Sequence, residues 1–169
     1  MSDDFKRRDL FRLTAGGLLV AGLGVAETPA FFTKDEFAAV DELMETIIPT
    51  DDHSPGAKAA GCAVYVDRQL TESVDQELKQ KWHAGLKALE AKCHAKFDKG
   101  IVDVTPDERA ALLHEISQNE KNAATPEEKF FNILKYATAF AYYSSSIGIH
   151  KEIEYKGNVY LKEFAGTEV

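Results

Sequence analysis

The stretch at residues 126–147, PEEKFFNILKYATAFAYYSSSI, constrains the fold more than any other part of the chain. Thr125 is a suitable N-cap, the following proline suits the first helical position, and Glu128 completes a capping box, so a helix is predicted to begin here. Its apolar residues cover most of the helix circumference, and a helix that is apolar all round is usually buried. We therefore expect an all-α fold in which the other helices pack around this one. The serine run 144–146 and Gly148 should end the helix.

The sequence predicts four further helices upstream, which makes a small bundle of about five helices around the C-terminal one. Each has apolar residues at three- or four-residue spacing, and Pro49 ends the first of them. After Gly148 the sequence contains the turn signal of residues 156–158, so we expect an irregular tail. The predicted upstream helices cover residues 33–48, 57–71 and 74–97, together with one that begins at Thr105.

The size and charge of the chain narrow the class of protein. Its 169 residues suffice for one domain with a core, and its 44% hydrophobic and 28% charged content is ordinary for a globular protein. The net charge of −8 argues against nucleic-acid binding, because neutralisation of the phosphate backbone supplies most of that affinity. We expect residues 31–169 to form a single helical domain that binds no nucleic acid.

Residues 1–30 have the layout of an export signal. A basic segment, residues 6–12 (KRRDLFR), precedes an apolar stretch and a small-residue end. The apolar stretch, residues 13–25, spans roughly 20 Å at ~1.5 Å rise per residue, which is too short for a hydrocarbon core of ~30 Å. The pair Arg7-Arg8, followed by Leu10 and Phe11, resembles the twin-arginine export motif. Two other interpretations stay open, namely a general secretory signal and an uncleaved amphipathic anchor.

The export signal predicts a periplasmic location, either free or associated with the inner membrane. Cleavage after Ala30, with Thr28 at position −3, fits the small-residue rule, and so does cleavage after Ala26, with Gly24 at position −3. The twin-arginine translocase carries proteins that are already folded. Its cargo commonly contains a cofactor or is bound to a protein that does.

The body of the chain lacks the usual cofactor and metal motifs. None of the five histidines forms an HxxxH or HExxH pattern, and there is no CxxC, P-loop, GxSxG or GxGxxG sequence outside the signal segment. Cys62 and Cys93 lie on neighbouring predicted helices. They either form a disulfide after export or pack as free, small apolar side chains, and the sequence leaves both open. We expect no cofactor and no metal to be bound by this chain.

The acidic loop at residues 50–57 (TDDHSPGA) has two interpretations. Asp51, Asp52 and His53, together with His150, are residue types that carry out acid–base catalysis, and loops on rigid scaffolds often carry function. The alternative is an acidic turn that caps the neighbouring helices. The catalytic interpretation predicts a stand-alone periplasmic enzyme.

The aromatic residues near the C-terminus also have two interpretations. They form either a binding face, since tyrosine is enriched at protein interfaces, or part of the core. A small bundle can hardly bury all of them. An independent ligand-binding bundle with an apolar pocket is a further alternative. The residues concerned are Phe140, Tyr142, Tyr143, Tyr155, Tyr160 and Phe164.

Several segments match, in order, the pattern of one family. A twin-arginine segment is followed by a helix that ends Ile47-Ile48-Pro49 and by an acidic loop that leads into Ser54-Pro55-Gly56-Ala57. Further along the chain, an aromatic helix contains Thr138 and Tyr142-Tyr143-Ser144-Ser145. The tail then contains the motif Tyr155-x-Gly157-Asn158. Over most of residues 32–160 the chain resembles the gluconate 2-dehydrogenase subunit 3 family, the small subunits of membrane-associated sugar dehydrogenases. It departs from the family in the tail, where residues 160–164 replace a tryptophan and a closing Gly-Tyr-Pro.

The resemblance implies a non-catalytic subunit. In this family the large subunit is an FAD-binding flavoprotein of the glucose–methanol–choline (GMC) oxidoreductase type, and a cytochrome c subunit often completes the complex. The small subunit carries the twin-arginine signal, helps the large one to mature and escorts it through the Tat translocase. The residues expected to dock the large subunit are Pro49, Asp51, Ser54, Pro55, Gly56, Tyr142, Tyr143, Tyr155, Gly157 and Asn158.

Overall fold

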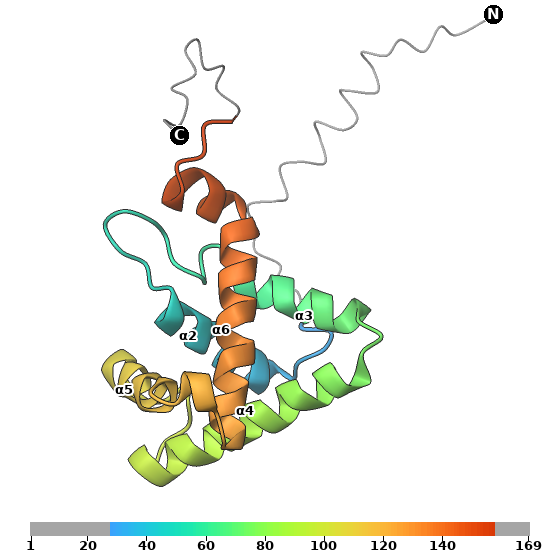
Figure 1. The fold of residues 1–169 in the computed structure, drawn as a ribbon, viewed down its shortest axis with the longest axis vertical. Helices are drawn as coiled ribbons and strands as arrows, with labels where there is room; N and C mark the ends of the chain where they lie inside the picture. Colours follow the sequence, from blue (N-terminus) through green and yellow to red (C-terminus); the bar gives the residue numbers. More distant parts are fainter. Residues whose placement is uncertain (1–27, 158–169) are drawn as a thin grey trace, which may run out of the picture.

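The computed structural model describes residues 28–157, which adopt the all-α fold that the sequence predicts (Figure 1). None of the helices in this range combines the length and the hydrophobicity that a membrane span requires. The α-helices are α2 (Lys34–Ile47), α3 (Cys62–Glu72), α4 (Gln76–Phe97), α5 (Pro106–Ser117) and α6 (Pro126–Ser144), with the 3₁₀ turn η2 (Glu120–Asn122) and the π-helical turn η3 (Gly148–Glu152).

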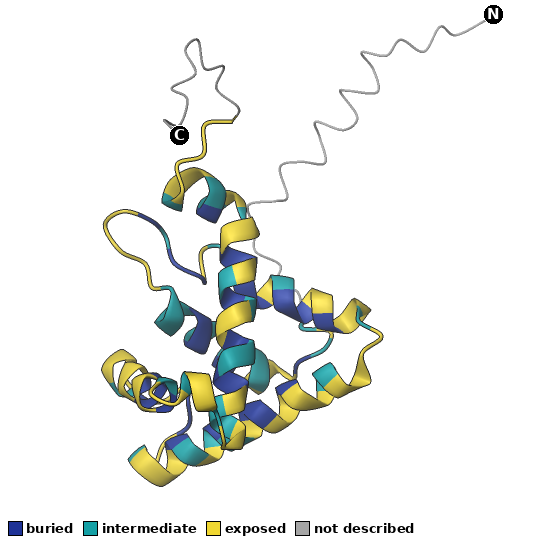
Figure 2. Ribbon diagram, in the orientation of Figure 1, coloured by how far each residue is buried: buried dark blue, intermediate teal, exposed yellow. Residues whose placement is uncertain are grey.

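Helix α6 is central, as predicted. It contacts α2, α3, α4 and α5, and Figure 1 shows the other helices arranged around it. Its closest neighbour is α4, where the ring of Trp82 meets that of Phe130 edge-on at 5.3 Å between centroids. Gly85 allows this approach, because a Cβ there would lie 2.2 Å from the Phe130 ring. The buried residues of the five α-helices form one core. Figure 2 marks the buried positions in dark blue along the ribbon.

The helix starts follow from local sequence. Three helices begin with a capping box, including the one predicted for α6, with the threonine hydroxyl accepting a backbone N–H and the glutamate accepting the threonine N–H in return. These reciprocal bonds satisfy N–H groups that a helix leaves unpaired at its start. The three pairs are Thr33 with Glu36, Thr105 with Glu108, and Thr125 with Glu128.

One helix boundary and the form of the tail differ from the prediction. The second helix begins at Cys62 instead of residue 57, because Gly61 has a left-handed backbone (φ 69°) and the residues before it form a turn. Helix α6 ends at Ser144, the first of the serines expected to end it. The Ser145 hydroxyl bonds the Tyr142 carbonyl at 2.7 Å and accepts the Gly148 N–H at 3.0 Å, which turns the chain into η3. The tail is therefore helical over Gly148–Glu152, where an irregular segment was predicted.

Candidate functional site

The loop between α2 and α3 is fastened to α6 by a buried hydroxyl cluster. The Tyr142 hydroxyl donates to the Pro55 carbonyl at 2.8 Å and lies 2.6 Å from the Ser54 hydroxyl. Tyr142 is 1% exposed and Ser54 is 4% exposed. The structure thus brings together two segments that the sequence singled out, but their meeting point lies inside the protein. We name Ser54, Pro55 and Tyr142 the hydroxyl joint.

A single carboxylate, that of Glu45 on α2, holds the start and the end of this loop. It accepts the Thr50 N–H at 3.0 Å, the Thr50 hydroxyl at 2.9 Å and the Lys58 N–H at 2.8 Å. Gly56 lies against it, since a Cβ there would be 2.5 Å from the Thr50 nitrogen and 2.6 Å from the Glu45 carboxylate. Glu45 was not predicted from the sequence. Its position one turn before Pro49 was the only available signal.

Asp51 shapes the tip of the loop. Its carboxylate accepts the backbone N–H groups of His53 and Ser54, each at 2.8 Å. The bond from Ser54 and then the bond from His53 hold the pKa of Asp51 below its usual value. A carboxylate held ionised in this way is suited to ordering a turn, and unsuited to donating a proton.

The two histidines of the catalytic alternative do lie close to one hollow. His53 and His150 both border a shallow depression, and His53 Nε2 lies 3.3 Å from the Glu152 carbonyl oxygen, which joins the loop to η3. Within residues 28–157 no group of three or more His, Cys, Asp or Glu side chains is arranged to hold a metal ion.

Helix α6 also carries exposed aromatic side chains. Tyr136 is 73% exposed, Phe140 48% and Tyr143 46%. Their spacing of four and three residues places them along one side of the helix, and we name them the aromatic stripe. The expectation that α6 is buried all round is therefore wrong on this side, where these three side chains stay exposed.

An apolar groove runs beside the aromatic stripe. It has a volume of about 510 Å³ and lies between α3, the start of α4 and α6. The ring of Phe140 stands between those of Tyr136 and Tyr65, with centroid distances of 6.3 Å and 6.2 Å. Exposed apolar area with aromatic rims is typical of surfaces that bind another protein.

The residues predicted to dock a partner divide by exposure. Those at the hydroxyl joint, with Gly56, are buried or half-buried and hold the fold. The exposed ones are Pro49, Asp51, Tyr143, Tyr155 and Gly157. Outside the described residues lie Asn158, Tyr160 and Phe164, and the predicted export-signal residues Arg7, Arg8, Leu10 and Phe11.

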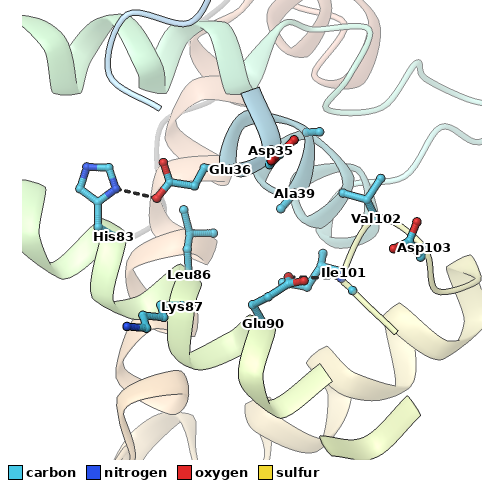
Figure 3. Close-up of a pocket in the computed structure, with 12 residues that line it drawn as sticks. Asp35, Glu36, Ala39, His83, Leu86, Lys87, Glu90, Ile101, Val102 and Asp103 are labelled. Carbon is cyan, nitrogen blue, oxygen red and sulfur yellow. Dashed lines mark hydrogen bonds and ion pairs between the residues drawn. The ribbon is translucent and has the colours of Figure 1, made fainter. Parts of the chain in front are cut away.

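A hollow of about 690 Å³ lies between the start of α2, the middle of α4 and residues 100–103 (Figure 3). His83 Nδ1 lies 2.7 Å from Glu36 Oε1 at one side of it. Partial burial acts to raise the pKa of Glu36, but bonds from Thr33 and His83 outweigh it and lower that pKa. Glu90, at the other side, accepts the Ile101 N–H at 3.3 Å. The Glu36 carboxylate thus caps the start of α2 and bonds to His83, and the Glu90 carboxylate holds the backbone at Ile101.

Cys62 and Cys93 are both buried and both free in this structure, as in the second of the two interpretations. The thiols lie in different electrostatic surroundings: Asp41 and Glu45 act on Cys62, whereas Arg109 is among the charges that act on Cys93. Burial raises the pKa of Cys62 to about 11 and raises that of Cys93 as well. Such thiols are unreactive and pack as small apolar groups.

Comparisons with known proteins agree with the sequence resemblance. Residues 34–159 match the family model of gluconate 2-dehydrogenase subunit 3. Comparison with curated proteins and with solved structures gives no match. The matched range runs from the first residue of α2 past η3, so it includes the hydroxyl joint and the aromatic stripe. This chain therefore belongs to the gluconate 2-dehydrogenase subunit 3 family.

Proposed function

We propose that this chain is the non-catalytic small subunit of a periplasmic, FAD-dependent sugar or polyol dehydrogenase. In this proposal the large GMC-type flavoprotein binds FAD and carries out the oxidation, and a cytochrome c subunit receives the electrons. The small subunit assists maturation of the flavoprotein and escorts it through the Tat translocase. Family membership over residues 34–159 is the observation that carries the proposal.

The arrangement of α6 supports a role in binding a large protein partner. Three aromatic side chains stay exposed along one side of the helix, beside an apolar groove of about 510 Å³. Interfaces are enriched in such aromatic anchors, and a few of them typically carry most of the binding energy. We propose that the aromatic stripe contacts the flavoprotein, together with the exposed residues Pro49 and Tyr155 near the loop and the tail.

The order of the loop between α2 and α3 supports the same role. Glu45, the Asp51 turn and the hydroxyl joint fix the loop from three sides. A rigid surface loses little conformational entropy on binding, which favours affinity. In this proposal the buried members of the loop act as its frame, and the exposed members act as contacts.

The first test is purification of the tagged chain from the periplasm of its native cells, with an absorbance scan for flavin. We expect a yellow complex with a much larger protein in equal amount. The twin-arginine part is tested by Arg7→Lys with Arg8→Lys, which should leave the flavoprotein in the cytoplasm, because lysine does not reproduce the fixed guanidinium pattern. A colourless chain that purifies alone would overturn the proposal.

The docking surface is tested with matched substitutions. Phe140→Ala should reduce recovery of the flavoprotein at least tenfold, as expected of an interface anchor worth ~2 kcal/mol. Val102→Ala is the control, since Phe140 and Val102 are both 48% exposed and Val102 lies on the loop between α4 and α5. Equal recovery of the flavoprotein with the two variants would exclude the aromatic stripe as the docking surface. The assignment of this chain as a subunit would then depend on the flavin scan alone.

A further inference from the structure

A buried carboxylate receives the first described residues of the chain. Asp67, on α3, is 7% exposed. Its Oδ2 accepts the Ala30 N–H at 2.8 Å, and its Oδ1 accepts the N–H groups of Phe31 at 3.1 Å and Phe32 at 2.9 Å. Three consecutive backbone donors thus converge on one side chain some 35 residues further along the chain.

This carboxylate has no cationic partner among residues 28–157. The hollow that it borders, about 370 Å³, is also lined by Arg68 and Glu72, which pair with each other at 3.2 Å. A buried charge is costly when only neutral donors face it, and it is much more favourable when a cation also bonds to it. Among the described residues, Asp67 is therefore a buried anion that is faced by neutral donors alone.

The segment that occupies this site is one of the two cleavage sites that the sequence predicts. Thr28 and Ala30, at positions −3 and −1, are both exposed, whereas Phe32 is buried and 3% exposed. Its ring lies 5.6 Å from that of Trp82 in the core. Exposure thus falls over three consecutive residues, from the exposed Ala30 through the half-buried Phe31 to the buried Phe32.

We propose that signal cleavage takes place after Ala30 and that Asp67 is the receptor for the new N-terminus. Water adds across the Ala30–Phe31 peptide bond, so that Ala30 leaves with a carboxylate and the Phe31 nitrogen becomes an ammonium. This nitrogen already lies 3.1 Å from Asp67 Oδ1. Cleavage converts the neutral Phe31 N–H into a cationic ammonium group with three N–H donors. One of these donors replaces the bond that Asp67 loses with Ala30. Removal of the signal thereby stabilises the attachment of the mature N-terminus to Asp67.

Cleavage after Ala26 would not have this effect. It would leave residues 27–30 ahead of Phe31, so the Phe31 nitrogen would remain a neutral amide and Asp67 would keep the three neutral donors that it has in this structure. The small-residue rule allows both cleavage sites, and the contacts of Asp67 favour the site after Ala30.

The ion pair predicts a specific pH dependence. An α-amino group has an ordinary pKa of ~7.7–8.0, and a carboxylate beside it raises that value. Its stabilising contribution is complete below the unfolded pKa and is lost as the pH rises through the folded pKa. The neighbouring titratable groups are the Arg68–Glu72 pair and His83, which stacks on Phe31 at 4.6 Å. Glu36, 2.7 Å from His83, completes the set. None of these groups has an ordinary pKa between 8 and 10.

The test begins with the mass of the chain purified from the periplasm, and this step rests on the export part of the proposed function. We expect a protein that begins at Phe31. A protein that is exported but begins elsewhere would overturn this inference and leave the proposed function intact. A protein that is never exported or cut would overturn both.

The second measurement compares the exported protein with the uncleaved full chain made by membrane-free translation. We expect the processed form to melt ~4 °C or more above the precursor at pH 7, and the gap to close by pH 10. Asp67→Asn should lower the melting temperature of the processed form more than that of the precursor. Asp52→Asn, at an exposed loop position, is the control and should lower neither. A gap that does not change with pH, or equal losses from Asp67→Asn in both forms, would overturn the inference.

Discussion

Replacing Tyr142 with phenylalanine tests how much the hydroxyl joint contributes to stability. The change keeps the buried ring and removes one oxygen, which bonds the Pro55 carbonyl at 2.8 Å and lies 2.6 Å from the Ser54 hydroxyl. The Ser54 hydroxyl keeps only a long contact to the Pro55 carbonyl, at 3.4 Å. A buried polar group that loses its partner costs ~1–3 kcal/mol, so we expect a loss of ~2 kcal/mol.

For a chain of this size a loss of ~2 kcal/mol corresponds to a fall in melting temperature of ~4–8 °C. Thermal unfolding followed by circular dichroism measures the fall, and amide hydrogen exchange should show faster opening at residues 50–57. Tyr143→Phe is the matched control. It removes the hydroxyl of the adjacent tyrosine, which is 46% exposed and has no hydrogen-bonding partner within residues 28–157, so the melting temperature should not move.

A cycle with Ser54→Ala separates the bond from the general cost of each substitution. The double variant should be less destabilised than the sum of the two single variants by ~1 kcal/mol, because the two hydroxyl groups share one bond. Two results would refute this reasoning: Tyr142→Phe melting within 1 °C of the unsubstituted protein, or strict additivity in the cycle.

Two other predictions concern the frame of the bundle. Gly85→Ala should destabilise the protein by ~1–3 kcal/mol although alanine favours helices, because the new Cβ would lie 2.2 Å from the Phe130 ring. Thermal unfolding measures this loss of stability. Phe130→Leu in the same chain should recover part of the loss. Glu128→Gln should lower the melting temperature at pH 7, since hydrogen bonds from Asn119 and then from the backbone lower the pKa of Glu128 to about 2. Such a group stabilises the fold above its unfolded pKa of ~4.3, so the gap between the two proteins should close as the pH falls from about 5 to 2.

Much of the helical layout could be predicted because its signals are local. Each capping box combines a threonine with a glutamate three residues later, and such a pair is visible without knowledge of the fold. The end of α6 was harder, since Ser144 and the serines after it favour helix termination without fixing its position. The bond from the Ser145 hydroxyl to the Tyr142 carbonyl decided it, and sequence spacing does not show which serine forms that bond.

The candidate site could be predicted only as two segments. The motif at residues 54–57 and the aromatic helix were both recognised, and the structure joins them through Tyr142. Their exposure could not be predicted, because a tyrosine packs well both in a core and at an interface. Asp67 was not recognised, since its partners are backbone N–H groups 35 to 37 residues away and such donors have no sequence signature.

The two roles of α6 are divided between neighbouring residues. Tyr142 and Tyr143 are consecutive, so their side chains point about 100° apart on the helix. One is buried in the hydroxyl joint, and the other belongs to the exposed aromatic stripe, with 5.4 Å between the two ring centroids. Because the first fixes the loop and the second is free to meet a partner, substitutions at Tyr142 should act on stability, and those at Tyr143 should act on partner binding. The sequence Tyr-Tyr therefore combines a fold determinant and a proposed recognition element in adjacent positions.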